Sequence, residues 1–173
     1  MKNKALMCAL LAVIFAVSLI LSGCGSKGSL ETFVEKAGVS LEGGDVSEED
    51  THGGGGGDGT YLAVIRFGGP REDITGNDKW KPLPLSATIY TALYGFSDGT
   101  GEYLILPLVD FESEGMKESI PKIENGYYYF EDRHAKSRDP ADDTDLLARK
   151  SYNFTLAIYD SDSFTLYVLI EDT

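Results

Sequence analysis

The chain has 173 residues, and its 15 Lys and Arg against 28 Asp and Glu give a formal net charge of −13 at pH 7. This acidic balance argues against nucleic acid and against docking on anionic lipid through a basic patch, but it permits cationic proteins or peptides as partners. The same charge also keeps a protein soluble without any specific partner.

The N-terminus has the pattern of a secretory signal. Lys2 and Lys4 precede an apolar run over residues 5–21, which ends at Leu21-Ser22-Gly23-Cys24. This ending resembles the lipobox of bacterial lipoproteins, which implies cleavage before Cys24 and lipidation of its sulfur, including acyl chains such as palmitate. More than one lipid chain makes a stable anchor. We therefore expect an extracytoplasmic protein anchored by lipid to the bacterial cell membrane, and the alternative is an uncleaved spanning helix.

Cleavage would divide the chain into a signal peptide, residues 1–23, and a mature protein of 150 residues. The mature protein would carry 13 bases and 28 acids, a net charge of −15. Its length suffices for one domain with a core. Because Cys8 leaves with the signal and Cys24 carries lipid, no thiol remains for a disulfide, a thiolate metal site or a cysteine nucleophile.

Residues 24–59 are expected to form the lipidated cysteine and a flexible tether. Four apolar residues at helical spacing predict one short helix, which needs packing to be stable: Leu30, Phe33, Val34 and Ala37. An acidic run at 48–50 and five consecutive glycines at 53–57 then indicate a solvated spacer.

From residue 60 the pattern changes to β, and residues 60–173 are expected to form one domain. The branched and aromatic run at 61–67 predicts a strand, and further strands are expected within 85–96 and 103–111. Asn125-Gly126 is a strong turn signal. A turn or two of helix is expected around 143–149.

The C-terminal segment predicts a long antiparallel hairpin. Apolar residues alternate over 152–158 and 164–170, with a polar turn at 160–163. We expect both apolar rows to face one core. The domain then has about six or seven strands, so the predicted fold class is all-β: an antiparallel meander, a sandwich or a small barrel.

The strand expected at 126–132 carries candidate ligand-binding residues. Alternation places Tyr127 and Tyr129 on one face and Tyr128 and Phe130 on the other. An exposed tyrosine pair would line a groove for sugars or peptides. The structural alternative is a central strand that is buried on both faces.

Arg133 and His134 follow this strand and complete the candidate ligand site. His134, the sole histidine of residues 60–173, has the chemistry of a general base, with Asp132 to orient it. However, no Gly-x-Ser-x-Gly nucleophile motif accompanies it. Charged residues at a strand end also commonly fix a loop through ion pairs.

Four carboxylates cluster shortly after this segment, and they form a candidate metal site: Asp139, Asp142, Asp143 and Asp145. Oxygen ligands at this density suit calcium, the one cofactor that we consider. The glycine and the distal glutamate of an EF-hand loop are absent. Alternatively, Asp143 caps the short helix that follows.

The lipobox, the closing hairpin and residues 126–134 together resemble a group of small, uncharacterised bacterial lipoproteins. The similar part spans residues 124–173, including 153–160 and the terminal Glu171-Asp172-Thr173. The resemblance implies location and domain extent, and no particular activity. We expect a non-catalytic binding or cell-envelope interaction module. One alternative is a binder or inhibitor of a cationic protein, and another is a small hydrolase of envelope polymers that uses His134.

Overall fold

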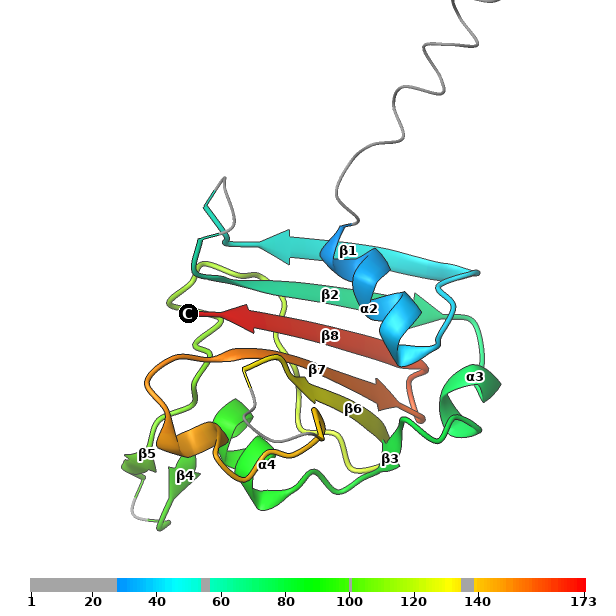
Figure 1. The fold of residues 1–173 in the computed structure, drawn as a ribbon. Coiled ribbons are helices and arrows are strands. Elements are labelled where there is room, and N and C mark those ends of the chain that lie inside the picture. The colour runs from blue at the N-terminus through cyan, green and yellow to red at the C-terminus, as the bar shows by residue number, and fades with distance from the viewer. Residues whose placement is uncertain (1–27, 54–56, 100, 135–138) are drawn as a thin grey trace, which may run out of the picture.

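Six antiparallel strands form the main sheet in the order β1-β2-β8-β7-β6-β3, and two more form a small sheet, β4-β5 (Figure 1). The computed structural model describes residues 28–53, 57–99, 101–134 and 139–173. The elements are α2 (Ser29–Ala37), β1 (Gly44–Asp50), β2 (Gly59–Phe67), α3 (Glu72–Thr75), β3 (Lys81–Pro82), α4 (Ala87–Tyr94), β4 (Phe96–Ser97), β5 (Tyr103–Ile105), β6 (Gly126–Asp132), the 3-10 turn η1 (Leu146–Ala148), β7 (Asn153–Asp160) and β8 (Thr165–Asp172).

The predicted antiparallel all-β class is confirmed. β1 and β3 form the two edges of the main sheet, and within the described ranges neither edge pairs with the other, so the sheet does not close into a barrel. Short helices, rather than a second large sheet, cover its faces (Figure 1).

The closing hairpin is confirmed as β7-β8, but the prediction that its two apolar rows share one core is wrong. Leu156 pairs with Leu169, so these two residues lie on the same face. Val168, one residue away, lies on the opposite face. Along a strand, an offset of two residues keeps a side chain on the same face, and an offset of one residue moves it to the opposite face. The rows therefore belong to two cores, one on each side of the sheet.

The two cores are covered by different elements. Phe33 and Ala37 of α2, with Ile74 of α3 and Trp80, close one face. Three residues of α4 and one of η1 close the other: Ile89, Ala92, Leu93 and Leu146. Burial on both faces explains why the central strands are almost continuously apolar rather than alternating.

The predicted helix in the N-terminal region is present as α2, but the flexible tether is not what the structure shows. Phe33 and Ala37 are buried, and Gly38 ends the helix in the left-handed conformation at φ 70°. β1, which includes the acidic run, pairs with all but the first two residues of β2. The folded region thus begins near Ser29 rather than at residue 60. Gly54 to Gly56 lie outside the described residues.

Two other strand predictions were wrong. Residues 87–94 form helix α4, because the Ser86 hydroxyl accepts a hydrogen bond from Ile89 N at 3.1 Å and caps the first turn. Only residues 103–105 of the apolar run at 103–111 form a strand. The short helix expected around 143–149 is confirmed as η1.

Gly126 is needed for a different reason from the predicted turn. It begins β6 at φ 155°, and a Cβ atom there would lie 1.8 Å from the carbonyl oxygen of Tyr159. Residues 106–125 contain no strand, so Asn125-Gly126 does not join a hairpin. The glycine instead permits the close approach of β6 to β7.

Candidate functional site

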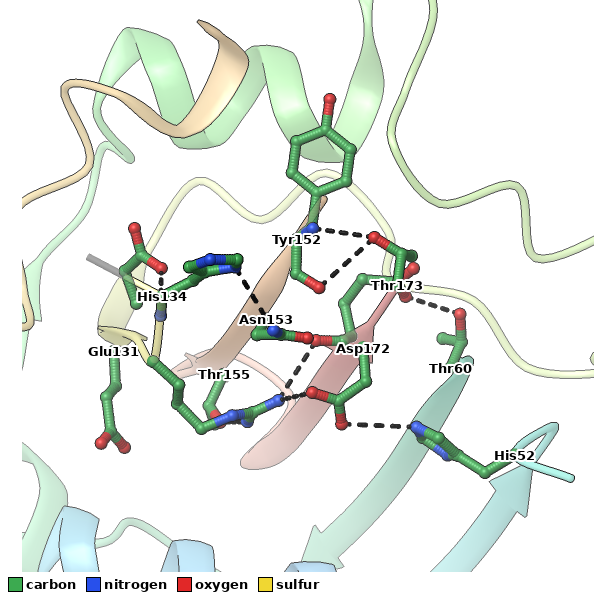
Figure 2. Close-up of polar contacts among 12 residues, drawn as sticks. His52, Thr60, Glu131, His134, Tyr152, Asn153, Thr155, Asp172 and Thr173 are labelled. Atoms are coloured by element: carbon green, nitrogen blue, oxygen red, sulfur yellow. Dashed lines mark hydrogen bonds and ion pairs between the residues drawn. The ribbon is translucent and has the colours of Figure 1, made fainter. Parts of the chain in front are cut away.

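A polar cluster lies where β6, β7 and β8 reach the same end of the sheet (Figure 2). Arg133, immediately after β6, donates from Nη1 to Thr155 Oγ1 at 2.6 Å. Its Nη2 donates to the Glu171 carbonyl oxygen at 3.1 Å and to Asp172 Oδ1 at 2.5 Å. One guanidinium therefore fastens the ends of three neighbouring strands.

Asn153 lies between this arginine cluster and His134. With its amide turned so that the nitrogen faces Asp172, Asn153 donates to Asp172 Oδ1 at 3.1 Å and to Tyr152 O at 2.8 Å. The side-chain amide of Asn153 also lies 3.4 Å from His134 Nδ1 (Figure 2). His134 is therefore connected to the cluster through an amide.

His52 reaches the cluster from the segment after β1. Its Nδ1 lies 2.6 Å from Asp50 Oδ1. Its Nε2 lies 3.4 Å from Asp172 Oδ2 (Figure 2). A pocket of about 760 Å³ opens here. Its lining includes the carboxylates of Asp50, Asp58 and Asp172, the imidazole of His52 and the guanidinium of Arg133.

Glu171, the neighbour of Asp172 in β8, is buried on the opposite face of the sheet, only 4% exposed. Its Oε2 accepts a hydrogen bond from the Thr60 hydroxyl at 2.6 Å. Burial, with a smaller contribution from the Glu114 and Asp172 carboxylates, raises the pKa of the Glu171 carboxyl to about 7, although the Thr60 hydrogen bond and His52 act to lower it. Glu171 therefore gains or loses its proton near neutral pH.

A groove of about 900 Å³ lies beside the pocket, between α2 and β1, and both are lined by Ser29 and Asp50. Its apolar lining consists of Leu30, Val34, Val39, Leu41 and Tyr61. Three carboxylates also line it: Glu31, Glu48 and Asp50. The combination of apolar and acidic groups suits an amphipathic cation.

β1 itself is an acidic edge strand. Register places Val46, Glu48 and Asp50 on the α2 face of the sheet, and Asp45 and Glu49 on the other. Within the described ranges β1 pairs with β2 alone. Its second edge therefore presents backbone donors and acceptors between carboxylates.

The tyrosine pair predicted to bind a ligand is mostly occupied by packing. Tyr129 lies 5.9 Å, between ring centroids, from both Phe33 and Trp80, and its hydroxyl donates to Glu131 Oε2 at 3.2 Å. Tyr127 also packs against this core, whereas Tyr128 is buried on the opposite face. The strand is thus largely covered on both faces, as the structural alternative expected.

The predicted pairing of His134 with Asp132 does not form. Asp132 accepts the backbone N–H of His134 at 2.9 Å, and its carboxylate pairs with Arg149 Nη2 at 2.7 Å. The imidazole faces Asn153 instead. Asp132 thus fixes the loop, which is the structural role that charged residues at a strand end commonly have.

The four candidate calcium ligands are not brought together as a ligand set. Asp139 and Asp142 accept hydrogen bonds from backbone groups two residues later in the chain, and Asp143 accepts one from the Ser86 hydroxyl. Asp145 precedes η1 and makes no side-chain cap. In the part of the chain that the structure describes, no three acidic, histidine or cysteine side chains are placed to hold a metal ion.

Neither His52 nor Asp172 was identified as a site residue from the sequence. His52 was assigned to the flexible tether, and Asp172 was treated only as the end of the closing hairpin. The spacing of Asp50 and His52 at the end of an acidic strand was the available signal. Cys24 lies outside the described residues. None of the described helices is long and apolar enough to cross a membrane.

The comparisons with known proteins place the chain in no group. No family model matches it, and neither a curated protein nor a solved structure matches it.

Proposed function

We propose that this protein is a lipid-anchored, extracytoplasmic, non-catalytic module that binds a cationic polypeptide along β1. The observation that carries the proposal is the acidic, unpaired edge of β1 next to the α2–β1 groove. An extended peptide can add a strand to such an edge through main-chain hydrogen bonds, while its alternate side chains enter the groove.

Charge selects the kind of partner. A second β1 in this position would set carboxylates against carboxylates, so self-pairing at this edge is disfavoured. A strand with alternating basic and apolar residues would place its apolar side chains over Leu30 and Val34 on the α2 face. Its cations would then lie on the other face, against Asp45 and Glu49. The binding should be strongest at low salt.

The binding proposal predicts that the full chain, in neutral phosphatidylcholine vesicles, binds a fluorescent peptide of alternating Lys and Val. A matched peptide of alternating Glu and Val should not bind. Asp45→Lys, on the exposed edge, should weaken binding about three- to tenfold, because it removes one attraction and adds one repulsion. Titration by fluorescence anisotropy measures this.

Asp78→Lys is the matched control, since Asp78 is exposed, lies away from β1 and changes the net charge equally. Equal loss of affinity in both variants would reduce the effect to net charge and contradict the edge site. Absence of binding by the parent chain would overturn the proposal.

The anchor rests on Leu21-Ser22-Gly23-Cys24 and has its own test. α2 begins at Ser29, five residues after Cys24. A fully extended chain of this length spans about 17 Å, so the lipid on Cys24 would hold α2 within about that distance. The groove beside α2 would therefore face the space next to the membrane.

Labelled palmitate supplied to cells producing the chain should be incorporated into the parent protein and not into Cys24→Ser. Cys8→Ser, which changes the cysteine inside the signal, should leave incorporation unchanged. Equal labelling of the parent and Cys24→Ser would refute lipidation at this residue, and a mature N-terminus other than Cys24 would refute the cleavage site.

A further inference from the structure

β4 and β5 lie beside α4 at the end of the molecule away from α2 (Figure 1). These elements and the residue after β5 carry an exposed apolar patch. Its six residues have the exposed fractions Tyr90 40%, Phe96 50%, Tyr103 57%, Leu104 62%, Ile105 43% and Leu106 69%. At about 200 Å² for a fully exposed residue of this size, they present roughly 640 Å². Soluble monomers rarely expose so large a contiguous apolar patch unless it binds something.

The edge of β5 is not protected against pairing. Residues 103–109 carry no charge. β5 pairs only with β4 among the described strands, so its second edge bears no partner. β1, in contrast, is an edge strand rich in charge, since four of its seven residues are acidic. Charged side chains are the usual means of blocking edge-to-edge association.

We propose that two copies of this chain associate through β5, antiparallel, into a continuous β4-β5-β5-β4 sheet. Full overlap of a three-residue strand with its own copy places Leu104 opposite Leu104 on the two-fold axis. The two patches together supply at most roughly 1,280 Å², so the interface lies at or below the lower end of the range for specific interfaces. The association is accordingly reversible.

The charge of the chain predicts how salt affects this contact. Two copies of net charge −13 repel each other, while the six patch side chains carry no charge, so salt should strengthen the association by screening. Salt should weaken the proposed binding of cations at β1. The two proposals can therefore fail independently.

Disulfide crosslinking of the full chain in phosphatidylcholine vesicles tests the inference. Opposite residues in an antiparallel pair have Cα atoms about 4.5–5.5 Å apart, which a disulfide spans. Leu104→Cys should give a covalent dimer on mild oxidation, increasing with salt. The parent chain, with Cys8 and Cys24, sets the background, and Val46→Cys is the matched control on the other edge, where the side chain is 41% exposed.

A second substitution distinguishes specific β5–β5 pairing from crosslinking by random encounters between molecules. Adding Leu106→Lys to Leu104→Cys places a cation in the contact and should reduce crosslinking about tenfold or more. The inference is wrong if Leu104→Cys crosslinks no more than Val46→Cys, or if Leu106→Lys leaves the yield unchanged. A vesicle-dependent blue shift of a bimane label on Leu104→Cys, without crosslinking, would assign the patch to lipid and also overturn it.

Discussion

Replacing Arg149 by Met should lower the free energy of unfolding by about 3–5 kcal/mol. The Asp132 side chain is only 2% exposed, and Arg149 holds it through Nη2 at 2.7 Å and Nη1 at 3.1 Å. Methionine keeps the apolar stem and removes the charge, so the carboxylate would stay buried without its counter-ion. Urea unfolding followed by circular dichroism measures the loss.

Two further variants identify the cause. Arg149→Met combined with Asp132→Asn removes the orphaned charge and should be more stable than Arg149→Met alone. Arg66→Met is the matched surface control, because Arg66 and Glu118 form a pair at 2.9 Å with side chains 48% and 34% exposed. It should cost at most about 1 kcal/mol. Equal losses for Arg66→Met and Arg149→Met would show that burial does not decide the effect.

Glu171→Gln should make the protein more stable than the parent above neutral pH, by at most about 3 kcal/mol. The pKa of Glu171 rises from 4.5 in the unfolded chain to about 7 in the fold. Below pH 4.5 the carboxyl is protonated in both states, and the full stability is present. As the pH rises from 4.5 through about 7 that stability is lost, because the unfolded chain releases the proton while the fold still holds it, and the loss is complete once both states are ionised. Partial solvent screening makes the figure an upper bound.

The measurement is urea unfolding of parent and variant at pH 4, 5.5, 7 and 8.5. The difference between the two proteins should increase with pH and level off above about 7. Glutamine keeps an oxygen that accepts from Thr60, so the contact itself survives. Glu124→Gln, at an exposed position, should show no such dependence. A parent-to-variant difference that is constant with pH would contradict a buried, proton-binding Glu171.

Local patterns accounted for much of the secondary structure, because short-range chemistry decides it. The strand at 61–67 and the closing hairpin could be predicted from their branched and aromatic residues and from the polar residues that flank them. α2 followed from apolar spacing and Gly38. α4 did not, since an apolar run such as 85–96 fits a buried helix and a buried strand equally well. The Ser86 cap and the burial of one face of the helix against the sheet favour the helix.

The candidate site depended on contacts that spacing does not specify. Arg133 was identified from the sequence, but its partners Thr155 and Asp172 come from β7 and β8, and their register decides which oxygens meet the guanidinium. His52 joins them because β1 pairs with β2, which the glycine-rich composition concealed. The amino-acid composition of this segment indicates a large loss of conformational entropy on folding, but it does not reveal the strand pairing that offsets that loss.

The sequence by itself determined the acidic charge, the absence of cysteines beyond Cys8 and Cys24, and the all-β class. These are properties of residue type and short-range alternation. Only the tertiary structure decided that the sheet is buried on both faces and that an acidic strand forms one edge while an uncharged strand is open elsewhere. Those features depend on which strands become neighbours, and strand order is decided by long-range packing.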